Sequence, residues 1–265
     1  MESIVDADLV TAGEPLTDGE CCRVEGGALL HVHDAAPHTP LACFVHDSFR
    51  ALALNPRFAC LGGQAAVRQN AYRFGLYGEI GRAASSMALA RDLASFNADI
   101  GLRTHPFTAF VASFVSPVTG GEEAFERALW TTLEQLSDVD PEPWVGNRRA
   151  DPADPEFAFS FGGVALFVIG LHAGSSRLAR RFAWPTLIFN PHDQFDRLRR
   201  DGKYARLQTM IRRRDVALQG TINPMLADFG EASEARQYSG RAVGADWECP
   251  FRSREGKPVS RPEEP

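Results

Sequence analysis

The chain has 265 residues, of which 44% are hydrophobic and 23% charged, proportions typical of a globular protein rather than of a disordered or fibrous one. Its 34 acidic and 28 basic side chains give a net charge of -6, which argues against a sequence-independent nucleic-acid surface or an anionic-membrane surface. No apolar run approaches the roughly 18 residues of a membrane span, and no basic segment followed by an apolar one opens the chain, so a cytoplasmic protein is expected.

In chain order, the first predicted feature is an irregular N-terminal region. Residues 1–40 are broken by Gly, Pro and acidic side chains into short pieces. The other end, 252–265, combines high charge with three prolines and no apolar periodicity. Both ends are therefore expected to be poorly ordered around a single-domain core of about 40–251.

Helices are predicted for the first half of this core. Segment 122–137 places Phe125, Leu129 and Leu133 on one apolar stripe at helical spacing. A long loop rich in prolines and acidic residues follows at 138–155. Further helices are predicted in three segments rich in Ala, Leu and Arg, namely 41–54, 64–76 and 83–96.

Strands are predicted for the second half. Alternating Phe side chains at 157–161, the turn residues Gly162-Gly163 and the apolar run 164–171 indicate a buried antiparallel hairpin. Other predicted elements are the strands 107–115 and 186–189 and the helices 194–200 and 204–218. Helices first and strands later suggest an α+β fold, with helices packed around a mostly antiparallel sheet.

Two histidines stand where predicted strands end. His172 ends the second hairpin strand, and His192 lies at the corner between a strand and a helix. Three arginines follow His172 within ten residues: Arg177, Arg180 and Arg181. A neutral imidazole can bind haem iron and arginines can pair with haem propionates, although each residue taken singly is more often structural.

Other motifs give weaker indications. Cys60 beside Gly62-Gly63 stands at a predicted helix start, where backbone N–H groups could lower a thiol pKa. His31-x-His33 would place two imidazoles on one strand face, but no third metal ligand of clear spacing accompanies them. The five cysteines show no Cys-x-x-Cys spacing, and the chain contains no G-x-S-x-G, P-loop or H-E-x-x-H motif.

Several short blocks, taken together, resemble the YqcI/YcgG family over about residues 44–251. The blocks are Phe58-Ala59-Cys60, Gly170-Leu171-His172, Arg180-Arg181-Phe182, Phe189 to Phe195, Gln219 to Pro224, Asp228-Phe229-Gly230, Glu234 to Arg241 and Trp247 to Phe251. The combination of the His192 and Tyr238 blocks is the specific part of the resemblance. The chain departs from the family pattern at Ala59 and Ala173, where Pro is frequent.

The resemblance implies a haem b enzyme. Members of this family resemble haem-dependent N-hydroxylases of guanidine-bearing amino acids, including the arginine hydroxylase of D-cycloserine antibiotic biosynthesis. The implied reaction is a monooxygenation of L-arginine to Nω-hydroxy-L-arginine with O2 or peroxide, and a reductase would donate electrons. No nucleic-acid or membrane partner is implied, and a homodimeric assembly is left open.

The implied roles fall on the residues already singled out. His172 is the first expectation for the proximal iron ligand, with Arg177, Arg180 and Arg181 at the propionates. His192 is the second candidate for the iron ligand, and if His172 holds the iron, His192 is expected to be a distal proton donor. A thiolate ligand from Cys60 or Cys249 ranks lower. Tyr238 is expected to hydrogen-bond oxygen or substrate. Substrate-binding candidates are Asp228, Glu231 or Glu234 for a guanidinium, and Arg236 or Arg241 for a carboxylate.

Two other functions remain open from the sequence. One is a haem or metabolite binding module without catalysis. The other is a transferase or hydrolase that acts on a guanidine with Cys60 as its nucleophile.

Overall fold

A seven-stranded sheet in the order β2-β1-β3-β4-β7-β6-β5 forms the centre of the molecule. The structure is a computed structural model that describes residues 19–32, 38–99, 101–227 and 230–253. The strands are β1 (Glu20–Glu25), β2 (Ala28–His31), β3 (Tyr72–Tyr77), β4 (Ala109–Phe114), β5 (Phe159–Phe161), β6 (Val164–Leu171) and β7 (Thr186–Pro191). The β3–β4 ladder is parallel and the other five ladders are antiparallel, which confirms the α+β prediction with a mostly antiparallel sheet in one domain.

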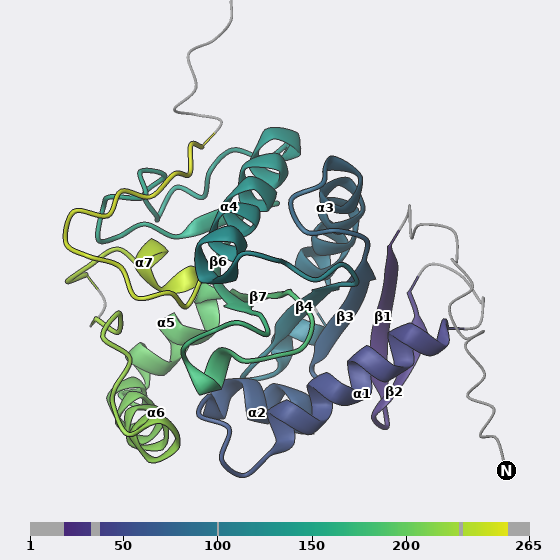
Figure 1. Cartoon of the computed structure of the whole chain (residues 1–265), viewed down its shortest axis with the longest axis horizontal. Coiled ribbons are helices and arrows are strands. Elements are labelled where there is room, and N and C mark those ends of the chain that lie inside the picture. Colours follow the sequence, from purple (N-terminus) through teal and green to yellow (C-terminus); the bar gives the residue numbers. More distant parts are fainter. Residues whose placement is uncertain (1–18, 33–37, 100, 228–229, 254–265) are drawn as a thin grey trace, which may run out of the picture.

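Helices cover both faces of this sheet. They are α1 (Pro40–Leu54), α2 (Leu61–Arg68), α3 (Ala83–Ala98), α4 (Gly121–Val139), α5 (His192–Arg200), α6 (Tyr204–Gln219) and α7 (Ala235–Tyr238). Figure 1 shows α3 and α4 on one side of the sheet and α1 and α2 on the other. No helix in the described part of the chain is both long and apolar enough to cross a bilayer.

Side-chain alternation along the strands divides the core into two clusters. In β4, Phe110 and Ala112 pack toward α3 and α4, whereas Ala109 and Val111 pack toward α1 and α2. Each strand of the sheet centre therefore contributes to both faces, which explains why apolar residues follow one another in these strands.

The sequence prediction is wrong in two places. The helix predicted at 64–76 is two elements, because α2 ends at Arg68, Asn70 adopts a left-handed conformation with φ 53° and β3 begins at Tyr72. The N-terminal region predicted to be irregular holds the β1–β2 hairpin, whose turn uses Gly26 and Gly27 at φ 58° and 89°. The expected disorder of 1–18 and 254–265 lies outside the described residues.

His46 on α1 makes the fold sensitive to acid. Its ring is 1% exposed and hydrogen-bonds the Tyr72 hydroxyl over 2.8 Å, and burial lowers its pKa from 6.5 to about 4. The unfolded chain therefore takes up a proton on this ring at a higher pH than the folded chain does. The resulting stability is fully present above pH 6.5 and is lost as the pH falls toward 4, by on the order of 3 kcal/mol.

We expect His46→Gln to remove this part of the pH dependence. Urea unfolding between pH 4 and 7 measures it, and the free energy of unfolding of the variant should fall less steeply with acid than that of the wild type. Equal slopes for the two proteins would contradict the assignment. His105→Gln is the matched control, because His105 stands in a short connection and is only half-buried.

Candidate functional site

A cavity of about 270 Å³ lies between the sheet and the helices of the α1–α2 side. Phe167, Ile169 and Leu171 of β6 line it, while the alternate residues Leu166 and Val168 belong to the core on the α3–α4 side. Ile188 and Val111 extend the same wall on β7 and β4. The walls are thus mainly apolar, as in sites that bind large organic ligands.

The opposite wall comes from α6. Tyr204, Leu207, Ile211 and Asp215 recur at helical spacing on the face of α6 that lines the cavity. Although this face points into the molecule, Asp215 is the only buried residue of the helix. The apolar side chains of this face therefore border the cavity and are not packed against other side chains. Such an arrangement is typical of a ligand-binding site.

His192 is the histidine that lines the cavity. It opens α5 directly after Pro191, and it is 3% exposed. Its Nε2 lies 3.0 Å from the Glu234 carboxylate, so the N–H is at Nε2 and the acceptor lone pair is at Nδ1. Nδ1 is buried and has no hydrogen-bond partner in the described part of the chain. The ring thus has an unused ligand atom, and the residue that carries it lines the cavity.

Glu234 connects His192 to Tyr238. The Tyr238 hydroxyl donates to the same carboxylate that accepts from His192, and the Phe159 N–H donates to that hydroxyl over 3.2 Å. Burial and the nearby Glu234 charge raise the pKa of Tyr238 well above its ordinary value, so the phenol stays protonated. Tyr238 does not line the cavity, but its hydrogen bond holds the Glu234 carboxylate, which does.

Arg177 and Arg180 also line the cavity. Arg177 is held by Asp215, whose carboxylate accepts from its guanidinium over 2.6 Å. Arg180 donates to the backbone carbonyls of Gly170, Gln237 and Tyr238, and no carboxylate among the described residues pairs with it. Burial lowers the pKa of Arg180 to about 10, so it stays charged at neutral pH. A cation without an anionic partner suits an anionic ligand group.

Cys60 is another predicted residue that lines the cavity. It caps α2, where its Sγ accepts from the Gly63 N–H over 3.3 Å. Burial raises the pKa of its thiol and outweighs the opposing effects of Gly63 and Arg180. The thiolate expected from the helix start is therefore disfavoured.

His172 lies on the other face of the sheet. It follows Leu171, and its ring stacks on Phe125 of α4 at a centroid distance of 4.4 Å. His192 stands at the other end of the β6–β7 ladder, because Leu171 faces Thr186 while Leu166 faces Pro191. Five strand positions separate these pairs, or ~17 Å. The structure does not bring His172 and His192 together, so they cannot serve as proximal and distal groups of one haem.

The remaining candidates among the described residues also lie away from the cavity. Arg181 is exposed and donates to the Ser175 carbonyl, and Arg236 lies over the Trp247 ring. Cys249 is buried in the core on the α3–α4 side, and burial raises its pKa to about 12. Glu231 is exposed and Asp228 lies outside the described residues. Of the substrate-binding candidates, Glu234 alone lines the cavity among the residues that the structure describes.

Arg241 has a structural environment. Its Nε donates to Glu126 over 2.9 Å, and Glu126 is 7% exposed. We expect Arg241→Met to lower the free energy of unfolding by about 2 kcal/mol, because it leaves a buried carboxylate with only the Ser239 hydroxyl. Urea unfolding measures this, with Arg236→Met as a milder control. Unchanged stability would contradict the structural role.

Three charged residues of the cavity were missed in the sequence: Arg199, Arg212 and Asp215. Arg212 and Asp215 follow Leu207 and Ile211 on the half-buried face of α6, so the helical period of that segment was the signal that could have found them. Arg199 lies on α5, over the Tyr204 ring. The cavity thus joins one imidazole, two carboxylates and several guanidinium groups within apolar walls.

Comparisons with known proteins agree with the resemblance. The chain is 28% identical over 190 residues to the uncharacterized protein YcgG of Bacillus subtilis (strain 168), a match that covers 68% of this chain and 75% of that protein. No solved structure is significantly similar. The sequence profile of the YqcI/YcgG family matches residues 49–252, which include every element from the end of α1 to α7. The chain belongs to the YqcI/YcgG family.

Proposed function

We propose that this protein is a haem-dependent monooxygenase that N-hydroxylates a guanidine-bearing amino acid, with L-arginine as the leading substrate. The observation that carries the proposal is the buried Nδ1 of His192, which has no hydrogen-bond partner among the residues that the structure describes and belongs to a residue that lines an apolar cavity. Family membership, together with the activity that the resemblance implies, supports the same reading.

The residues of the cavity fit a haem. A porphyrin needs apolar walls, a ligand for its iron and cations for its propionates. Phe167, Ile169 and Leu207 supply such walls, His192 would hold the iron, and Arg180 would pair with a propionate. Bound haem would supply the oxygen-activating chemistry, with O2 and a reductase or with peroxide. His192 replaces His172 as the proposed ligand, because His172 faces Phe125 on the far side of the sheet.

The chain's own groups would position the reactants. Glu234 accepts the Nε2 hydrogen of His192, which fixes the ring and keeps the lone pair at Nδ1. The apolar walls exclude water, so that polar contacts to a bound guanidinium or carboxylate gain strength. Arg199 and Arg212 replace Arg236 and Arg241 as candidates for the substrate carboxylate, because they line the cavity.

Product analysis tests this function. The haem-loaded full-length chain is supplied with L-arginine, O2 and a chemical reductant, or with peroxide, and mass spectrometry follows formation of Nω-hydroxy-L-arginine. Agmatine, which lacks the carboxylate, and L-citrulline, which lacks the guanidinium, are the matched comparison substrates. Turnover of L-arginine above both is expected. A chain that binds haem but hydroxylates no guanidine under either condition would be a binding module.

Cys60→Ser separates the haem function from a thiol-dependent one. Serine keeps an oxygen acceptor for the Gly63 N–H at the N-cap, so the start of α2 is preserved. We expect haem content and hydroxylation within about twofold of the wild type, since burial holds this thiol protonated. Loss of all activity in Cys60→Ser, with haem still bound, would instead favour a cysteine nucleophile.

A further inference from the structure

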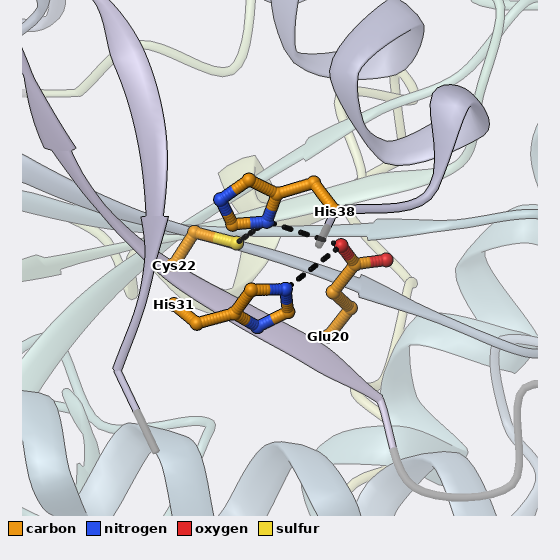
Figure 2. Close-up of side chains that lie close together, drawn as sticks. All are labelled: Glu20, Cys22, His31 and His38. Carbon is orange, nitrogen blue, oxygen red and sulfur yellow. Dashed lines mark hydrogen bonds and ion pairs between the residues drawn. The ribbon is translucent and has the colours of Figure 1, made fainter. Parts of the chain in front are cut away.

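Four metal-ligating side chains meet away from the cavity, where the β1–β2 hairpin lies beside the start of α1. They are Glu20, Cys22, His31 and His38, and one ligand atom from each lies within 4.8 Å of the other three. Figure 2 shows the two imidazoles one above the other, with the thiol and the carboxylate on either side of the space between their nitrogens. His33, the second histidine of the sequence motif, lies outside the described residues.

The fold brings these residues together by strand pairing. Glu20 and Cys22 are two positions apart on β1 and share one face of the strand. His31 is the direct cross-strand partner of Cys22 on β2. His38 comes from the segment before α1, next to Thr39, whose N–H and hydroxyl both donate to the Glu20 carboxylate. The four side chains thus come from three separate segments: β1, β2 and the residues before α1.

We propose that Glu20, Cys22, His31 and His38 form a tetrahedral Zn²⁺ site. Zinc–ligand bonds of about 2.0–2.3 Å place the ligand atoms of a tetrahedron about 3.3–3.8 Å apart. The His38 Nδ1 lies 3.2 Å from Glu20 Oε1 and 3.5 Å from Cys22 Sγ, and the His31 Nε2 lies 3.5 Å from Glu20 Oε1. These three distances are close to the edges of such a tetrahedron, and the other three are within 4.8 Å. The His31 and His38 rings are stacked at a centroid distance of 4.0 Å, so one ring must turn for both lone pairs to meet the ion.

A backbone hydrogen bond orients the His38 ring for metal binding. Its Nε2 lies 2.7 Å from the Leu29 carbonyl oxygen, which can only accept a hydrogen bond. The ring hydrogen is therefore at Nε2, and the lone pair of Nδ1 points toward Cys22 and Glu20. A ligand histidine whose other nitrogen donates to a carbonyl is the usual arrangement around protein-bound zinc.

Charge and burial also fit a zinc ion. A thiolate and a carboxylate together neutralise Zn²⁺, and the two imidazoles are neutral, so the loaded site carries no net charge into the interior. The Cys22 proton passes to solvent when the metal binds. Cys22 is 0% and Glu20 7% exposed, and no lysine or arginine in the described part of the chain pairs with Glu20.

The donor set selects the metal and its role. Thiolate and imidazole ligands suit Zn²⁺, whereas Ca²⁺ and Mg²⁺ take oxygen ligands. Four protein ligands leave no open position for a substrate, which is typical of a structural site. The ion would tie the edge hairpin β1–β2 to the N-terminus of α1, separate from the haem chemistry of the cavity.

Metal analysis and cobalt substitution test the site. The full-length chain, produced with added zinc, is expected to carry one zinc ion, measured separately from iron. After chelation, Co²⁺ should restore the site and give the visible bands of tetrahedral cobalt with an ultraviolet thiolate-to-cobalt band. Cys22→Ser should remove the thiolate band and lose the zinc on dialysis, and His38→Gln should lose the zinc as well.

Cys21→Ser is the matched control. Cys21 is the neighbouring buried cysteine on β1, and its side chain faces the core on the α3–α4 side. This variant should keep both the zinc and the thiolate band. A wild-type chain that takes up neither metal, or a thiolate band that is missing from the wild type or persists in Cys22→Ser, would overturn the proposal. If Cys22→Ser fails to fold, the wild-type and Cys21→Ser spectra decide. None of these readouts requires haem or turnover.

Discussion

His192→Ala is expected to abolish haem retention and to lower hydroxylation by about 100-fold or more. The substitution removes an imidazole whose Nδ1 has no hydrogen-bond partner within the described ranges, and it leaves the Glu234 carboxylate and the Tyr238 hydroxyl with each other. The haem content of the purified chain and its Soret absorption measure the first effect. Free imidazole should enter the space left by the ring and restore part of the Soret band.

His172→Ala is the matched comparison, because His172 is also a buried histidine at the end of a core strand. Its ring stacks on Phe125 on the far face of the sheet, so this variant should be less stable but should retain haem. Circular dichroism shows whether each variant is folded. Haem lost from His172→Ala and kept by His192→Ala would restore the assignment that the sequence favours. Haem kept by both would place the iron on another residue.

Leu207→Trp should block the cavity without unfolding the protein. Leu207 is half-buried on the face of α6 that lines the cavity, so an indole there would occupy space that the proposal gives to the porphyrin. Haem content is expected to fall at least tenfold, whereas the melting temperature of the haem-free chain should stay equal or rise, since added apolar area is buried in a hollow. Absorption spectra and thermal unfolding measure the two effects.

Val216→Trp is the control for this variant. Val216 lies on the same helix with 39% of its surface exposed, and it does not line the cavity. A tryptophan there changes the helix composition equally and should leave haem content unchanged. If Leu207→Trp bound haem as well as Val216→Trp does, the site could not be the cavity beside α6.

Local sequence signals predicted most elements of the fold. The apolar stripe at Phe125, Leu129 and Leu133 corresponds to α4, and Gly162-Gly163 turns the β5–β6 hairpin as expected. The same two-glycine signal at Gly26-Gly27 marks the β1–β2 hairpin, but it stands in a region whose Gly, Pro and acidic residues predict irregular chain. At 64–76, helix propensity was extended across Asn70 into β3, where pairing with β4 decides the conformation.

The site was less predictable than the fold, because the face of the sheet and the strand register decide which side chains meet there. The sequence correctly places His172 at a strand end, but the alternation along β6 turns it toward Phe125 and away from the cavity. The sequence could not show that Glu234 would lie within 3.0 Å of His192, since 42 positions separate them. Likewise, strand pairing places His31 beside Cys22 of β1, and His38 joins them from the segment before α1. The spacing of these residues along the chain does not predict that they meet.

Titration of the haem-free chain with haemin tests the central claim most directly. We expect a Soret band that saturates at one haem per chain and shifts again when L-arginine is added, because the substrate would enter the same cavity. A folded, colourless chain that takes up no haemin would contradict it.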